Sequence, residues 1–106
     1  MLNEESFEPR ATSSGERRRA TRTPIQGHVV IQWIHDPDET IRYRVLDRSD
    51  TGLRLRLALP LVEGLSGRAI NFLPTGESIN EAFIVAWCRP DGDGGYEAGL
   101  RYLSAA

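Results

Sequence analysis

The sequence predicts an all-β fold, a small antiparallel barrel or sandwich of about six strands. Apolar and polar residues alternate with a period of two in several short runs, as they do in strands with one buried face. These runs recur at roughly ten-residue intervals, and glycine and proline stand between them. No stretch has the apolar spacing of an amphipathic helix. A length of 106 residues fits one domain, and closure into a barrel would remove exposed strand edges.

The first two expected strands form a hairpin. Residues 27–34, GHVVIQWI, alternate apolar and polar side chains, and residues 41–46, IRYRVL, do the same with arginines at the polar positions. The acidic segment between them, residues 35–40, is expected to be the turn. The side chains expected on the inward face are Val29, Ile31, Trp33, Ile41, Tyr43 and Val45.

The clearest alternation lies in residues 53–59, LRLRLAL, where four leucines point one way and two arginines point the other. One face of this strand is therefore expected to meet a core and the other to meet water. Three more strands are expected within residues 67–74, 79–87 and 96–103, with turns rich in glycine and proline between them. The leucines expected in the core are Leu53, Leu55, Leu57 and Leu59.

The first 16 residues predict a flexible tail, because they are rich in Ser, Glu, Thr and Gly and have few apolar side chains to bury. They lack the apolar core of a secretory signal, and no apolar run is long enough to cross a membrane. The single cysteine, Cys88, agrees with a reducing compartment. Together these features predict a cytoplasmic protein without membrane insertion.

The charge of the chain is distributed unevenly. Thirteen basic residues stand against 15 acidic ones, and the net charge of −2 argues against binding to DNA or RNA. The basic charge is concentrated in residues 16–24, ERRRATRTP, where four arginines fall within six positions. Such a cluster, taken alone, is typical of a solvated arm or a weak anion site.

The sequence offers little support for catalysis or metal binding. Cys88 could nominally act with His28 or His35, but it lies beside a tryptophan in a strand-like run and is interpreted as a structural cysteine. The glycine-rich residues 91–95, DGDGG, lack the later ligands of a calcium loop and are interpreted as a hairpin turn. Two histidines without metal-ligand spacing predict no zinc site. We therefore expect no catalytic residues, no metal and no enzyme.

A second short motif, DRSDTG, lies between two expected strands. Alone it reads as a turn, in which Asp47 and Ser49 bond nearby amides and Gly52 allows an unusual φ or a close approach of backbone. About 25 residues earlier, Arg18 and Arg22 have an RxxxR spacing, and the second motif has a DxSxxG spacing. This pair of motifs resembles the PilZ family, which binds cyclic dimeric GMP.

The resemblance extends over residues 16–103, because GLRLRL, AWCRP and YEAGLRYL also look like PilZ strands. It implies a six-stranded antiparallel β-barrel over residues 17–104, which includes a mobile arginine switch segment at its N-terminal end. It also implies a receptor or adaptor that binds the dinucleotide, reorders its arm and relays the signal to an effector protein.

The arginine arm fits this ligand chemically. Cyclic dimeric GMP presents two phosphates, guanine edges that accept bidentate hydrogen bonds, and flat rings on which guanidinium groups stack. Arg18 and Arg22 can supply all three kinds of contact. Arg17 adds a further cation, which suits an interleaved pair of dinucleotides with four phosphates.

The barrel residues have roles only by similarity to the family. Asp47 and Ser49 would supply polar contacts to the nucleotide, with the carboxylate of Asp47 accepting from guanine N–H groups. Gly52 would keep the wall open for a close approach of the ligand.

The alternative hypothesis is a PilZ-fold interaction module that binds protein, or RNA through the basic arm, without nucleotide. The net acidity argues against RNA, and the intact motifs argue against loss of the ligand. The chain lacks the helix that often follows the last PilZ strand. Self-association as a homodimer or docking onto another protein would then cover the end of the barrel.

Overall fold

The computed structural model describes residues 23–104. Seven strands and no helix lie within this range, and therefore no helix there could span a membrane. The strands are β1 (Thr23–Pro24), β2 (His28–Trp33), β3 (Asp36–Ser49), β4 (Gly52–Leu57), β5 (Ser66–Leu73), β6 (Ser78–Pro90) and β7 (Tyr96–Tyr102).

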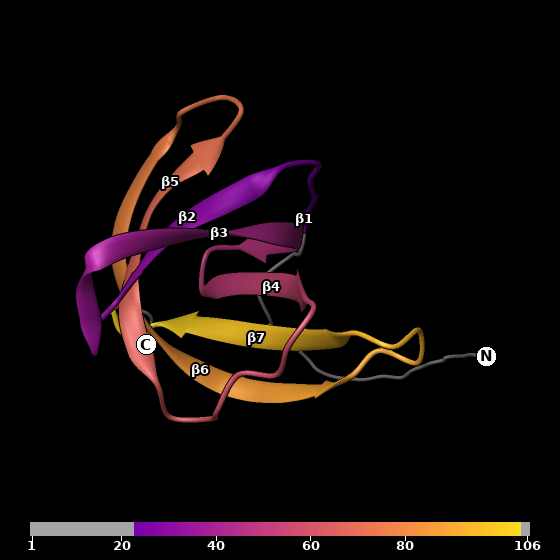
Figure 1. Ribbon diagram of the computed structural model, residues 1–106. Helices are drawn as coiled ribbons and strands as arrows, with labels where there is room; N and C mark the ends of the chain where they lie inside the picture. The colour runs from indigo at the N-terminus through magenta and orange to yellow at the C-terminus, as the bar shows by residue number, and fades with distance from the viewer. Residues whose placement is uncertain (1–22, 105–106) are drawn as a thin grey trace, which may run out of the picture.

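The strands form one antiparallel sheet in the order β1-β3-β2-β5-β6-β7-β4, and an additional β3–β4 pairing closes it. The closed part is a six-stranded barrel (Figure 1), as expected from the alternation and from the PilZ resemblance. The short strand β1 adds to the barrel beside β3. Because every strand from β2 to β7 has a neighbour on both sides along part of its length, most of the sheet has no open edge.

The barrel interior is filled by the apolar side chains that the alternation places inward. Phe83 of β6 and Leu53 and Leu55 of β4 are fully buried. Burial of apolar surface of this kind is the main stabilising contribution in a small domain. The other fully or nearly fully buried large side chains are Ile31, Val29, Val45 and Val85.

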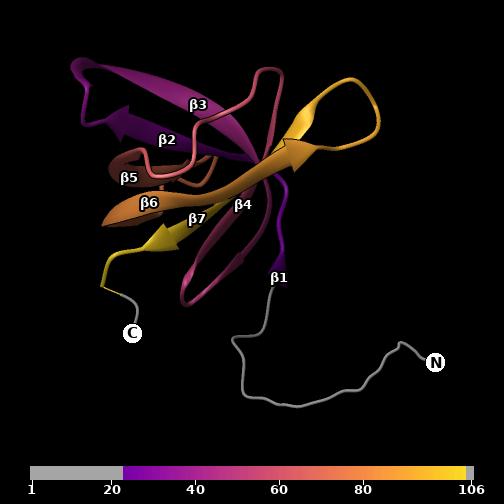
Figure 2. The ribbon, with the colours of Figure 1, turned by 90° about the horizontal axis from the view of Figure 1, so that it is seen from below.

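The β2–β3 hairpin differs from the expected one. Residues 35–40 were expected to form the turn, but the turn consists of Ile34 and His35 alone, and strand β3 begins at Asp36. A two-residue turn is the commonest connection of a tight hairpin. The six residues between the two apolar runs suggested a longer turn, although most of them belong to β3. Figure 2 shows the two strands leaving the barrel together as this hairpin.

The register of this hairpin explains why the acidic residues lie in strand β3 and not in the turn. Trp33 lies opposite Asp36, whereas Ile31 lies opposite Ile41. Five positions along β3 therefore match two positions along β2, which makes a large bulge in β3. Because the bulged residues 37–40 have no regular partner, their polar side chains lie in solvent.

Two apolar residues expected in the core lie outside it. Leu59 is 76% exposed because β4 ends at Leu57, so the alternation of the LRLRLAL run does not continue as a strand. Ile41 is 42% exposed and adjoins the bulge. In this part of β3, β2 is the only described strand beside it, so no described strand on its other edge covers the side chain. Tyr43 is half-buried, and the other expected inward residues of these two strands are buried.

The segment DGDGG connects β6 to β7, as the hairpin-turn interpretation predicted. Asp91 Oδ1 accepts hydrogen bonds from the backbone N–H groups of Asp93 at 2.7 Å and Gly95 at 3.1 Å. The guanidinium of Arg56 lies 3.1 Å from Asp91 Oδ2. The bond from Asp93, then that from Gly95 and the charge of Arg56, hold the pKa of Asp91 below its usual value.

This lowered pKa makes the turn acid-sensitive. A carboxyl group whose pKa is lower in the folded state stabilises the fold above its unfolded pKa of about 3.9, and the contribution disappears as the pH falls through the folded value. The Asp91→Asn variant is therefore expected to lose less stability than the wild type between neutral pH and about pH 3. Thermal unfolding at a series of pH values measures this. Parallel curves for the two proteins would contradict it.

Candidate ligand-binding site

The DxSxxG motif lies where β3 turns into β4. Asp47 and Ser49 are in the last residues of β3, and Gly52 is the first residue of β4. Ser49 pairs directly with Gly52 across the turn. The three barrel residues predicted from the motif are thus brought together at one end of the β3–β4 hairpin.

Asp47 is a buried carboxylate held by an arginine. Only 5% of the residue is exposed, and its Oδ2 accepts from Arg54 Nε at 2.8 Å and lies 2.7 Å from Arg54 Nη2. A carboxylate held by two guanidinium nitrogens has a fixed orientation. Arg54 projects from β4 on its polar, outward face, where the alternation predicted it.

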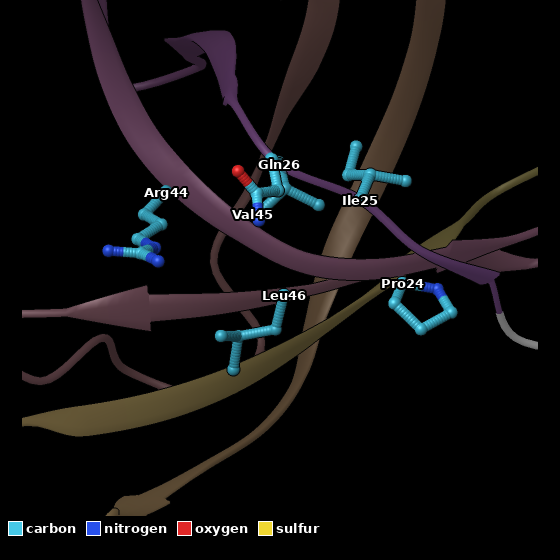
Figure 3. Close-up of a pocket in the computed structure, with 6 residues that line it drawn as sticks. All are labelled: Pro24, Ile25, Gln26, Arg44, Val45 and Leu46. Atoms are coloured by element: carbon cyan, nitrogen blue, oxygen red, sulfur yellow. The ribbon is translucent and has the colours of Figure 1, made fainter.

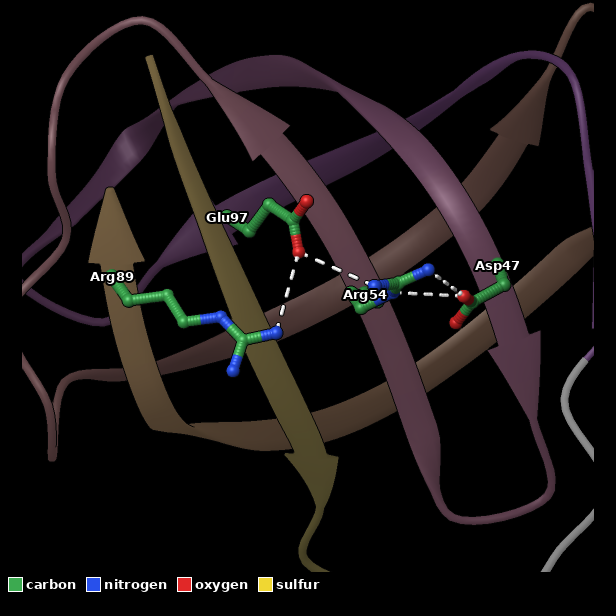
Figure 4. A network of polar contacts seen from close by, with 4 residues as sticks. All are labelled: Asp47, Arg54, Arg89 and Glu97. Atoms are coloured by element: carbon green, nitrogen blue, oxygen red, sulfur yellow. Dashed lines mark hydrogen bonds and ion pairs between the residues drawn. The ribbon is translucent and has the colours of Figure 1, made fainter. Parts of the chain in front are cut away.

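The contacts of Arg54 continue across the outside of the barrel (Figure 4). Arg54 Nη1 donates to Glu97 Oε1 of β7 at 3.3 Å, and the same oxygen lies 3.8 Å from Arg89 Nη2 of β6. The guanidinium of Arg89 lies 4.6 Å from the centre of the Trp87 ring. We refer to Asp47, Arg54, Glu97 and Arg89 as the four-residue network.

Ser49 stabilises the turn itself. Its Oγ accepts from the backbone N–H of Thr51 at 3.2 Å and lies 3.1 Å from the Thr51 hydroxyl. This local bond to an amide is the one the turn interpretation predicted.

Gly52 permits a close approach of two strands. A Cβ added at this position would overlap the carbonyl oxygen of Leu100, on the neighbouring strand β7. Barrel closure therefore accounts for a glycine here, whereas a role in ligand approach stays a prediction.

Arg48 lies inside the motif and binds it to the neighbouring β5–β6 turn. Its two terminal nitrogens donate to the Glu77 carboxylate at 3.0 and 2.9 Å, and its guanidinium lies 4.4 Å from the centre of the Phe72 ring. The hydrogen bond lowers the pKa of Glu77 and raises that of Arg48. The motif is thereby connected to the β5–β6 turn, 29 residues away in the sequence.

The first described residues of the chain lie beside this motif. Arg17, Arg18 and Arg22 lie outside the described residues, as does the tail of residues 1–16. The first described strand, β1, pairs Thr23 with Arg48 and Pro24 with Asp47. The residue that follows Arg22 in the chain is therefore paired with Arg48, the second residue of the DxSxxG motif.

A shallow pocket lies between β3 and the segment that leads from β1 to β2 (Figure 3). Its volume is about 420 Å³. One cation, Arg44, stands at its edge beside apolar and amide side chains. The lining residues are Pro24, Ile25, Gln26, Arg44, Val45 and Leu46.

The residues considered for catalysis have structural contacts. Cys88 is half-buried, and its sulfur accepts from the backbone N–H of Leu61 at 3.4 Å. His35 stacks on Trp33 with ring centres 5.9 Å apart. Within residues 23–104, no three His, Cys, Asp or Glu side chains are grouped to hold a metal ion.

The profile of the PilZ domain matches residues 16–106. The chain belongs to the PilZ domain family. PilZ domains are receptor or adaptor modules rather than enzymes, they bind cyclic di-GMP, and they interact with effector proteins. The match covers both motifs and the whole barrel, and so it confirms the resemblance drawn from the sequence.

A solved PilZ structure has the same fold. This is the Bacillus subtilis inhibitor of motility (MotI/DgrA), which superposes with a TM-score of 0.68 and is 28% identical in sequence. The superposition covers 86% of this chain and 44% of that protein, so the chain spans less than half of its length. No curated protein matches the sequence significantly.

Three features of this site escaped the sequence analysis. Arg54 was assigned only to the solvent face, and neither Glu97 nor Arg89 was considered. Arg48 was passed over although it stands within the motif. The alternation of β4 could have pointed to Arg54, because it places this side chain on the same face as the motif. The partners of Arg54 could not be predicted in this way, because they depend on the register between strands.

Proposed function

We propose that this PilZ chain is a cytoplasmic receptor for cyclic di-GMP that binds the dinucleotide between the RxxxR arginines and the end of the β3–β4 hairpin. The pairing of β1 with Asp47 and Arg48 carries the proposal, because it anchors the arm at the motif. Arg18 is five residues before Thr23, so its Cα lies within about 18 Å of that anchor even in a fully extended chain. Both motifs are thus within reach of one dinucleotide.

The chemistry of the two sides is complementary. The arm brings arginines, which bind phosphates and guanine edges with paired N–H groups. The barrel brings Asp47, whose carboxylate is oriented by Arg54, and Ser49, whose hydroxyl is held in the turn. Fixed acceptors of this kind lose little conformational entropy when a ligand binds. Ligand binding would then order the arm and change the surface that an effector protein contacts.

The direct test is calorimetric titration of the full chain with cyclic di-GMP, with GTP and cyclic GMP as controls. Saturable binding of cyclic di-GMP alone supports a receptor. If none of the three nucleotides binds, the receptor proposal is wrong, and the result favours the alternative of a PilZ-fold module that binds protein or RNA.

Arg54 is expected to act as a positioning residue for Asp47. The Arg54→Met variant removes the two contacts to Asp47 Oδ2 and should weaken cyclic di-GMP binding by roughly three- to ten-fold. Arg56→Met is the matched control, since Arg56 lies on the same face of β4 but pairs with Asp91. Equal losses of affinity in the two variants would indicate a general effect of charge rather than the positioning of Asp47.

Arg17 makes the stoichiometry a separate prediction. With four arginines between positions 17 and 22, the chain has enough charge to bind an interleaved pair of dinucleotides. Calorimetry should give about two ligands per chain, and Arg17→Leu should move the ratio toward one. A ratio of one in the unmutated protein would refute the pair and leave the site intact.

A further inference from the structure

The β2–β3 hairpin carries charges of opposite sign at its two ends. The acidic end, here called the hairpin tip, consists of residues 34–41 and includes Asp36, Asp38 and Glu39, all exposed. Further along β3, Arg42 and Arg44 are also exposed. Within the described chain, none of these five side chains forms an ion pair with another residue. The hairpin therefore presents unneutralised acidic and basic surfaces side by side.

The basic surface belongs to a groove. The groove has a volume of about 490 Å³ and lies between β3 and the loop that follows β4. One side is cationic, and the other is a wall of leucines. The residues that give it this character are Arg42, Arg44, Arg56, Leu57, Leu59 and Leu61.

Exposed apolar side chains gather at the same two places. Ile34 at the hairpin tip is 72% exposed, and Ile41 beside the bulge is 42% exposed. Leu59 in the groove is 76% exposed, and Val62, three residues further along the loop, is 68% exposed. Only Leu103 is a large exposed apolar residue elsewhere in residues 23–104. Apolar side chains clustered with unpaired charges are typical of an interaction surface.

We infer that this surface binds a second copy of the same chain. The hairpin tip offers carboxylates with an exposed isoleucine, and the groove offers guanidinium groups with the exposed Leu59, so the two are complementary in charge and in apolar character. Because the tip and the arginine side of the groove both lie on the β2–β3 hairpin, a two-fold axis lets each tip enter the groove of the other copy. Such an isologous contact closes on itself and produces a dimer rather than a filament.

The dimer is independent of the cyclic di-GMP site. The groove and the hairpin tip involve neither Asp47 nor Ser49, and Arg44 is the one groove arginine that also lines the pocket beside the motif. Loss of ligand binding and loss of the dimer can therefore be measured separately on the same protein.

Charge reversal tests the contact. A tip variant, Asp38→Arg with Glu39→Arg, and a groove variant, Arg42→Asp with Arg44→Asp, each place like charges against one another in both halves of the dimer. Sedimentation equilibrium of the full chain at low salt should show dimerisation weakened about ten-fold or more in each. The control is Asp50→Arg with Asp93→Arg, which makes the same charge change as the tip variant in two other turns.

Two combinations distinguish this contact from a general effect of charge or of misfolding. An equimolar mixture of the tip and groove variants should form a heterodimer, because each tip then faces a groove of opposite charge. A chain with all four substitutions keeps the wild-type net charge and should dimerise like the wild type. High salt should weaken the wild-type dimer, since these exposed charges are screened.

Three results would overturn the inference. The first is a wild-type chain that remains monomeric from micromolar to millimolar concentration at low salt. The second is a dimer that neither the tip nor the groove variant weakens. The third is a mixture of the two variants in which no heterodimer forms.

Discussion

Replacing Arg22 with alanine is expected to weaken cyclic di-GMP binding about ten- to hundred-fold, because a hydrogen bond between charged groups contributes roughly 1.5–3 kcal/mol. Arg18→Ala should have an effect of the same size. The fold should be unaffected, since the barrel core is made entirely by strands β2 to β7. Calorimetry measures the affinity, and thermal unfolding without ligand measures the stability.

Arg19→Ala provides the matched control in the same arm. Arg19 carries the same charge as its neighbours but occupies one of the three variable positions of the RxxxR motif. Its replacement should cost less affinity than that of Arg18 or Arg22. If all three substitutions weaken binding equally, the arm attracts the ligand only by its total charge, and the assignment of Arg18 and Arg22 is wrong.

Replacing Gly52 with alanine is expected to destabilise the barrel by about 1–3 kcal/mol or more. The added methyl group would overlap the carbonyl oxygen of Leu100, which is backbone of the adjacent strand and moves only if β4 and β7 separate. For a domain of this size, such a loss lowers the melting temperature by several degrees, and a thermal scan without ligand detects it.

The same variant separates two explanations of the motif glycine. Barrel closure predicts lower stability in the absence of any nucleotide. A variant with wild-type melting temperature and weakened cyclic di-GMP binding would show instead that the glycine serves the approach of the ligand.

The strands were predictable wherever one face is buried and the other is wet. The alternation in β4 identified Leu53, Leu55 and Leu57 as core residues, and the structure buries all three. It failed at Leu59, because a period of two cannot show where hydrogen bonding to the next strand ends. The two-residue strand β1 has no period to detect, since only its pairing with β3 defines it.

The site was predictable to the extent that it is local in sequence. Asp47, Ser49 and Gly52 lie within six positions, and the structure groups them in one hairpin. By contrast, Arg54 and Glu97 are 43 residues apart and meet only because β4 pairs with β7. Register between distant strands follows from packing of the whole barrel, which a single sequence does not encode locally.

The four-residue network consists of two arginines and two carboxylates, so its formal charges cancel. A dinucleotide with two phosphates therefore experiences no net attraction from this network at long range. Attraction over distance comes from arginines outside the network, those of the arm and Arg44 at the pocket, whereas the network acts only at contact. Raising the ionic strength should accordingly lower the association rate of the ligand. Substitutions in the barrel should mainly raise its dissociation rate.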